Sequence, residues 1–168
     1  MNFGVICVSD RCSKGLCEDK SGPAIIEMLS GLGKTKEYII VPDEKDEIEK
    51  ALICLCDDVK ADVVFTTGGT GFAPRDITPE ATKAVIEKEA PGIAEAIRIK
   101  SLAITPKAML SRAVSGIRKG TLIINLPGSP KAVAEALGFV IPVLPHAVEV
   151  LKGDTLSCGG NYGKGVVG

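Results

Sequence analysis

The chain has no tryptophan among its 168 residues, and aromatic residues make up only 4% of it. It also lacks an excess of either charge, because 20 Lys and Arg residues are balanced by 21 Asp and Glu residues. A surface that stacks bases or neutralises a phosphate backbone needs aromatic or basic clusters. We therefore expect no nucleic acid among the partners of this protein.

Patterns for zinc, secretion and membranes are also scarce. There is one histidine, and none of the six cysteines forms a C-x-x-C pair, so a zinc site is poorly supported. The longest nearly apolar stretch, 136–148, contains two prolines and the histidine, and is too short and interrupted to span a bilayer. No charged leader with a long apolar segment opens the sequence. We expect free thiols, a cytoplasmic location and no membrane association.

Apolar residues make up 45% of the chain, enough for the core of one compact domain. Strand-like apolar runs alternate with segments of helical periodicity. Strands are expected at 3–8, 38–41 and 62–67, with a β-hairpin formed by 114–118 and 121–126. Helices are expected to begin at Ser21, Thr78 and Ser129, and to lie within 48–59, 91–103 and 106–113.

This alternation predicts an α/β fold, with a doubly wound, mostly parallel sheet flanked by helices in three layers. No linker or internal repeat divides the chain, so we expect a single domain over 1–168 with a loose tail from 153. In such sheets ligands bind beyond the carboxyl ends of the strands. The polar strand ends at Ser9-Asp10, Asp43-Glu44, 68–76 and 125–129 should therefore meet in one crevice.

The stretch Gly68-Gly69-Thr70-Gly71 follows the third expected strand. Glycines let backbone N–H groups approach and turn toward a phosphate. The pattern is neither a P-loop nor G-x-G-x-x-G, because Pro74 occupies the last glycine position. A simple glycine-rich turn is the alternative. Thr78, followed by Pro79, is expected to cap the next helix.

Acidic residues stand at two of the strand ends, at Asp43 and Asp76. Carboxylates beside a phosphate repel it unless a cation lies between them, and Mg²⁺ bound by one or two carboxylates plus substrate phosphates meets that need. The alternatives are a solvated turn residue for Asp43, and for Asp76 a local cap or a salt bridge to Arg75.

A second strand–loop–helix junction spans Asn125 to Pro130. Its N–H groups and the amide of Asn125 could hold a base or another phosphate, while Ser129 caps the following helix. The pair Ser111-Arg112 could bind an anion, or it is an exposed helix end. His146, a lone histidine beside apolar residues, is interpreted as structural.

These motifs together resemble a known family. The segment from Thr66 to Glu80, T-x-G-G-T-G-x-x-x-R-D-x-T-P-E, resembles the signature of the molybdenum-cofactor biosynthesis family with a molybdopterin-binding fold. The resemblance covers essentially the whole chain. The segment 8–25 is similar to the opening of the Mog-type molybdopterin adenylyltransferases, and "VPDE" (41–44) and "NLPGSP" (125–130) follow in the right order.

The resemblance implies that the terminal phosphate of molybdopterin attacks the α-phosphorus of ATP and releases pyrophosphate. It places Asp43 and Asp76 at the catalytic centre with Mg²⁺. It also implies a homotrimer that hands its product to a molybdenum insertase. Nucleotide and phosphates would contact Gly68, Gly69, Thr70, Gly71, Asn125, Pro127, Gly128 and Ser129, and molybdopterin would contact Ser9, Asp10, Arg75 and Ser111.

Two other functions remain open at this point. One is a molybdopterin-binding carrier or paralogue that has the same fold without adenylyl transfer. The other is an unrelated nucleotide hydrolase, which the absence of a P-loop lysine disfavours.

Overall fold

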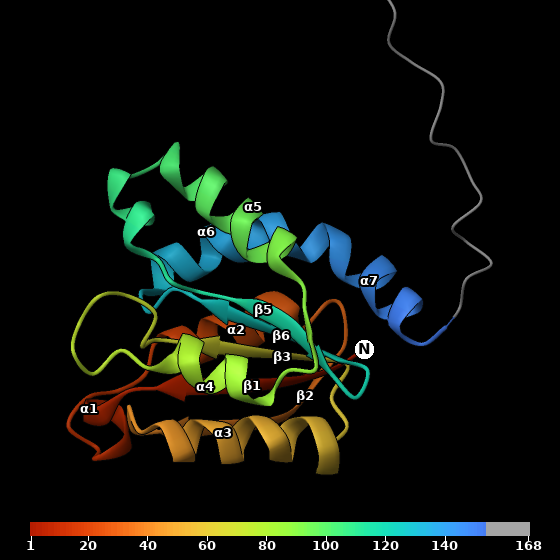
Figure 1. Ribbon diagram of the computed structural model, residues 1–168, viewed down its shortest axis with the longest axis horizontal. Coiled ribbons are helices and arrows are strands. Elements are labelled where there is room, and N and C mark those ends of the chain that lie inside the picture. Colours follow the sequence, from red (N-terminus) through yellow and green to blue (C-terminus); the bar gives the residue numbers. More distant parts are fainter. Residues whose placement is uncertain (154–168) are drawn as a thin grey trace, which may run out of the picture.

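A six-stranded sheet forms the centre of the protein in the computed structural model, which describes residues 1–153 (Figure 1). The strands lie in the order β2-β1-β3-β6-β5-β4. Strands β2, β1, β3 and β6 are parallel to one another, and β5 is antiparallel to both of its neighbours. The predicted mostly parallel sheet is therefore confirmed. The strands are β1 (Asn2–Val8), β2 (Lys34–Val41), β3 (Val63–Thr67), β4 (Lys88–Glu89), β5 (Ser115–Arg118) and β6 (Thr121–Leu126).

Helices cover both faces of the sheet, which gives the predicted three layers. One buried apolar cluster joins the sheet to α2 (Ser21–Leu29), α5 (Pro91–Leu102), α6 (Pro130–Val140) and α7 (Leu144–Leu151). A second cluster joins the opposite face to α3 (Lys45–Ile53) and α4 (Thr78–Val85). In Figure 1, α3 lies below the sheet, and α5, α6 and α7 lie above it. Four short segments complete the elements: α1 (Asp10–Ser13), the π-helical turn η1 (Cys54–Asp58), and the 3-10 turns η2 (Pro106–Leu110) and η3 (Ile141–Val143).

The central strands are apolar at nearly every position because both of their faces are covered. In β3, Val63 and Phe65 belong to the first cluster and Val64 to the second. The same alternation places Phe3 of β1 in the first cluster and Ile6 in the second. Side chains along a strand point alternately to its two faces, so a sheet buried on both sides produces continuous apolar runs.

Some elements differ from the expectation. Strand β2 begins at Lys34 rather than Tyr38, because an edge strand can be paired while its side chains stay polar and exposed. The short elements α1 and β4 leave no clear periodic signal. The expected hairpin is confirmed, and its turn has positive φ at both Lys119 (45°) and Gly120 (84°), as a two-residue hairpin turn requires.

The expected cap at Thr78 is wrong. Helix α4 begins at Thr78 itself, and its N-cap position is occupied by Ile77. The Thr78 hydroxyl donates instead to the carbonyl of Gly68 at 2.9 Å, and its N–H donates to the carbonyl of Gly69 at 3.1 Å. Thr78 therefore anchors the glycine loop to the start of α4.

The helical run Pro130–Leu151 is longer than the stretch 136–148 considered above. It has 22 residues and contains an 18-residue window with a mean hydropathy of 1.5, so it is long and apolar enough to cross a membrane by length and composition alone. The sequence prediction concerned 136–148 alone and did not consider this longer run. Val133, Leu137 and Leu144 are completely buried in the first cluster, so one face of this run packs against the rest of the protein.

The five cysteines within residues 1–153 are free thiols, as expected. Cys7 and Cys56 are buried, and burial raises the pKa of Cys56 to about 12. Such thiols are protonated at neutral pH and pack as small apolar groups. Cys158 and the expected loose tail beyond Gly153 lie outside the described residues.

Candidate active site

The polar strand ends meet at one edge of the sheet, as the parallel topology requires. Val8 of β1 pairs with Val41 of β2, and Cys7 pairs with Thr67 of β3. Thr67 pairs in turn with Leu126 of β6. The loops that follow these strands therefore emerge side by side. Strand order reverses between β1 and β3, and doubly wound sheets bind ligands at this switch point.

The glycine loop, residues 68–71, has backbone geometry that other residues adopt at a cost. Gly68 and Gly69 have φ values of +98° and +63°. A Cβ at position 68 would overlap the carbonyl of Val8, and one at position 69 would overlap the hydroxyl of Thr78. Glycine is therefore required here for positive φ and for close approach to neighbouring backbone.

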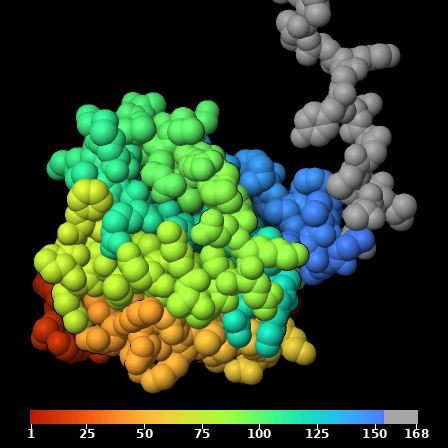
Figure 2. All heavy atoms as spheres, in the orientation of Figure 1, coloured from red at the N-terminus to blue at the C-terminus, as the bar shows by residue number. Residues whose placement is uncertain are grey.

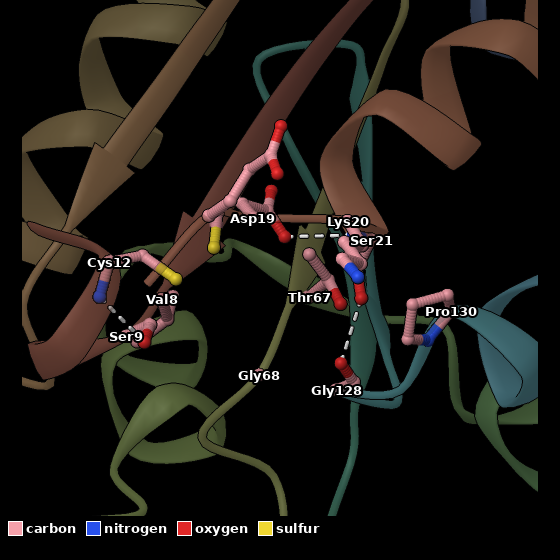
Figure 3. Close-up of a pocket in the computed structure, with 12 residues that line it drawn as sticks. Val8, Ser9, Cys12, Asp19, Lys20, Ser21, Thr67, Gly68, Gly128 and Pro130 are labelled. Carbon is pink, nitrogen blue, oxygen red and sulfur yellow. Dashed lines mark hydrogen bonds between the residues drawn. The ribbon is translucent and has the colours of Figure 1, made fainter. Parts of the chain in front are cut away.

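Two cavities lie on either side of this loop. The first, of about 310 Å³, is lined by Ser9, Cys12, Asp19, Ser21, Gly68 and Gly128, among others (Figure 3). The second, of about 410 Å³, includes Gly69, Thr70, Gly71, Asp76, Ser111 and Pro127 in its lining. Gly128 lines both cavities. The glycine loop and Gly128 thus form a shared wall, from which backbone groups are available to either side.

Asp43 lies in a network with Asp10 and Arg75. Asp10 N–H donates to Asp43 Oδ2 at 2.8 Å, and Asp43 N–H donates to Asp10 Oδ1 at 3.2 Å. The Arg75 guanidinium donates two bonds of 3.0 Å to Asp10 and one of 2.7 Å to Glu44. The bond from Arg75 lowers the pKa of Asp10, whereas burial raises the pKa of Asp43. Asp43 is thus half-buried, and its Oδ1 accepts no hydrogen bond from residues 1–153.

Asp76 is the second acidic residue of the site and lines the second cavity. Its Oδ2 accepts a bond from Ala73 N–H at 3.1 Å, so the side chain closes a local turn. The salt bridge to Arg75 that was one alternative is not formed within the described structure, because Arg75 points to Asp10 and Glu44. A Cβ at position 69 would lie 3.1 Å from Asp43 Oδ1, and one at position 71 would lie 2.9 Å from Asp76 Oδ2, so both carboxylates lie against the glycine loop.

The second loop, 125–129, is fixed by hydroxyl groups from two other elements. Thr67 Oγ1 donates to the carbonyl of Pro127 at 2.6 Å. Ser21 Oγ donates to the carbonyl of Gly128 at 2.8 Å (Figure 3). Ser129 caps α6 through its side chain, as expected. With both carbonyls held in this way, the loop is preorganised as a wall of the two cavities.

Asn125 is completely buried, and its amide is used inside the protein. Its Nδ2 donates to Thr66 Oγ1 and Thr82 Oγ1, both at 2.9 Å, and its Oδ1 accepts from Val114 N–H at 3.2 Å. The structure thus gives this amide a structural role that joins β6, β3 and α4. Of the loop residues expected to contact a ligand, Pro127 lines the second cavity and Gly128 lines both.

The four residues expected to contact molybdopterin do not line one cavity. Ser9 lines the first cavity and Ser111 the second. Asp10 and Arg75 pair with each other near Asp43. Any single ligand that touches all four would therefore have to extend past the glycine loop.

Sequence reasoning missed Asp19 as part of the first cavity. Its carboxylate accepts from the N–H groups of Ser21 and Gly22 at 2.8 and 2.9 Å, and from Tyr38 Oη at 2.6 Å. An acidic residue just before a helix start is a known capping pattern and could have indicated this role. Neither role considered for Arg112, anion binding or an exposed helix end, describes its guanidinium in the structure. Its Nε donates to the carbonyl of Gly71, and its Nη2 donates to the carbonyl of Asp76.

Within residues 1–153, no group of three or more His, Cys, Asp or Glu side chains is placed to hold a metal ion. A magnesium ion bound with a nucleotide needs fewer protein ligands, because phosphates and water supply the rest. Asp43 and Asp76 are hard oxygen donors beside a cavity wall of backbone amides. Their chemistry fits such an ion.

A doubly wound sheet whose switch point carries glycine-loop amides and open carboxylates defines an α/β protein that binds phosphate-containing ligands. The family described as "Probable molybdopterin binding domain" matches residues 4–146. The chain belongs to this family, as the resemblance of its motifs predicted.

Individual relatives agree with this assignment. The chain is 52% identical to the molybdopterin adenylyltransferase of Helicobacter pylori strain J99 over 157 residues, which cover 92% of this chain and 89% of the relative. It is 46% identical to the molybdopterin adenylyltransferase of Escherichia coli K12, with 91% and 86% covered. The crystal structure of the molybdopterin biosynthesis enzyme MoaB from Thermus thermophilus matches with a TM-score of 0.86 and 46% identity, covering 90% of this chain and 96% of that one.

Proposed function

We propose that this protein is a molybdopterin adenylyltransferase of molybdenum-cofactor biosynthesis. A phosphate oxygen of molybdopterin attacks the α-phosphorus of ATP, a new P–O bond forms, and the bond to the β-phosphate oxygen breaks. The products are adenylylated molybdopterin and pyrophosphate. The names and high identity of the relatives support this activity over that of a carrier.

The observation that carries the proposal is the shared wall between the two cavities. A transfer between two substrates needs two adjacent spaces with phosphate-binding groups at their boundary. The glycine loop and Gly128 occupy that boundary here, and the backbone N–H groups of a glycine loop can bind phosphate. Phosphoryl-type transfer requires positioning and charge stabilisation more than covalent chemistry, and preorganised amides supply both.

We assign Asp43 and Asp76 as the residues that would hold Mg²⁺. When bound, the ion neutralises negative charge on the phosphates of ATP. The raised pKa of Asp43, caused first by its burial and then by neighbouring acids, fits a carboxylate that a cation would stabilise in its ionised form. Asp76, at the second cavity, supplies the other oxygen donor.

A homotrimer is also proposed, with product passed to a molybdenum insertase. Exposed apolar residues gather on α5 and the segment after it, including Ile99, Leu102, Ile104, Met109 and Leu110. Figure 2 places these two segments together at the top of that view, in green and blue-green. Apolar groups gathered on one surface favour contact with another protein surface. Free thiols support a reducing cytoplasm as the location.

The direct test uses purified protein with molybdopterin, ATP and Mg²⁺. We expect formation of adenylylated molybdopterin with release of one pyrophosphate per product. An ATP analogue with a methylene group between the α- and β-phosphates should give no product, because the bond that must break is absent, and Mg²⁺ removal should slow the reaction with ATP. Molybdopterin binding without any adenylylated product would instead establish the carrier function.

A further inference from the structure

Arg112 lies between η2 and β5. It bonds to Gly71 and Asp76, which flank the exposed segment 72–75 that follows the glycine loop. Its Nε donates to the carbonyl of Gly71 at 2.6 Å, and its Nη2 donates to the carbonyl of Asp76 at 2.7 Å. Its backbone N–H donates to the carbonyl of Thr70 at 2.9 Å. Arg112, which is distant in sequence, therefore fixes three positions in the segment 70–76.

Other contacts hold the loop at different points: Arg75 bonds to Asp10 and Glu44, and Thr78 bonds to the carbonyls of Gly68 and Gly69, but neither joins Gly71 to Asp76. Residues 72–75 are exposed, and the local bonds between Ala73 and Asp76 close only a short turn. The carbonyls of Gly71 and Asp76 bracket this exposed segment. A guanidinium is a rigid planar fork, so bonding both carbonyls fixes the distance between the last loop glycine and Asp76.

Glu80 on α4 holds the guanidinium in place. Arg112 Nη1 is hydrogen-bonded to Glu80 Oε1, and Glu80 Oε2 is buried without a hydrogen-bond partner in the described structure. The charge of Glu80 is thus compensated mainly by Arg112. All three guanidinium nitrogens donate hydrogen bonds to protein groups. The guanidinium is therefore engaged within the protein, rather than held open for the anion considered for the pair Ser111-Arg112.

We propose that Arg112 is a positioning residue for adenylyl transfer. It holds the amides of the glycine loop and the carboxylate of Asp76 in one relative geometry, so that both meet the reacting phosphates together. The inference rests on the proposed function. Groups elsewhere, at Ser9 and at 127–129, still bind substrate without it, so loss of Arg112 lowers kcat more than it raises KM.

The test compares Arg112→Ala and Arg112→Lys with the control Arg118→Ala. Arg118 is a matched arginine at the opposite end of the sheet, where it makes two bonds to Asp57 and one to the carbonyl of Val85. We expect Arg112→Ala to lower kcat about 100-fold, because displacement of catalytic groups by about 1 Å has effects of this size. KM for ATP should change less than about threefold, since substrate-binding groups elsewhere remain.

Arg112→Lys keeps a charge beside Glu80 but has no fork, so we expect it to recover stability while kcat stays low. Added guanidinium ion should partly restore kcat in Arg112→Ala. The inference is overturned if KM rises while kcat is unchanged, or if Arg118→Ala lowers kcat as much as Arg112→Ala.

Amide hydrogen exchange without substrates separates this inference from the proposed function. We expect faster exchange across 68–80 in Arg112→Ala and unchanged exchange there in Arg118→Ala. If the parent protein forms no adenylylated product but this exchange difference appears, the proposed function fails and the bracing of the loop by Arg112 stands. Equal exchange in both variants overturns the bracing itself.

Discussion

Two aspartates at the carboxyl end of the central sheet, Asp43 and Asp76, have different hydrogen-bond partners from Asp57 at the opposite end. Among residues 1–153, Asp43 and Asp76 each accept one hydrogen bond, from a backbone N–H. At the opposite end, Asp57 accepts from Arg118 and Lys119. An aspartate side chain is therefore partly open at the carboxyl end, as in Asp43 and Asp76, and enclosed by cations at the opposite end, as in Asp57. Open carboxylates are suited to binding a cation or ligand, while enclosed ones contribute to folding.

The pKa values follow this difference. Burial raises the pKa of Asp43, and hydrogen bonds from Arg118 and Lys119 lower the pKa of Asp57 to about 2. A raised value means that the folded protein disfavours the ionised carboxylate, and a lowered value means that it favours ionisation. The site thus holds Asp43 at a cost to stability, as expected for a residue retained for function.

The largest effect is expected for Asp76→Asn. This change keeps the shape and the bond to Ala73 N–H but removes the charge that would hold the cation. We expect turnover to fall by about a thousandfold, since a metal ligand contributes several kcal/mol to transition-state stabilisation. Steady-state kinetics and urea unfolding measure the two properties separately. Near-normal turnover would reduce Asp76 to a structural cap, and the two ends of the sheet would no longer differ in function.

An intermediate effect is expected for Gly69→Ala, with Gly120→Ala as its matched control. Both glycines have positive φ, so each substitution should destabilise the fold by about 1–2 kcal/mol. A Cβ at position 69 also meets Thr78 and the Asp43 carboxylate, whereas no atom of residues 1–153 lies within 4 Å of one at position 120. We expect adenylyl transfer to fall about tenfold or more in Gly69→Ala only. Equal activities in the two variants would contradict the role assigned to the glycine loop.

The smallest effect on activity is expected for Asp57→Asn. A carboxylate with a lowered folded-state pKa stabilises the fold above its ordinary pKa of 3.8, and this contribution is lost as the pH falls through about 2. The stability difference between parent and variant should therefore be full at pH 7, shrink below about pH 4 and vanish near pH 2. Urea unfolding across this range measures it, with activity at pH 7 as the control. A stability difference between parent and Asp57→Asn that does not change with pH would contradict the structural role of Asp57. A large loss of activity in Asp57→Asn would contradict the functional difference between Asp57 and the aspartates at the carboxyl end.

Much of the fold could be predicted from local patterns. Continuous apolar runs located β1, β3 and β6, because strands buried on both faces must be apolar. The hairpin turn at Lys119-Gly120 was also predictable, since few residue pairs adopt positive φ twice. The polar edge strand β2 was underestimated, because it is held by backbone pairing that side-chain polarity does not reveal.

By itself the sequence determined that polar strand ends would gather at one edge, because parallel strands carry their carboxyl ends to the same side. Family membership also followed from the motif between Thr66 and Glu80. Only the tertiary structure decided how those polar groups are divided between ligand and protein. Asn125 is used within the core, Arg112 braces the glycine loop, and Asp43 keeps an open oxygen. These roles depend on partners 30 to 60 residues away, roughly the separation at which local periodicity carries no information.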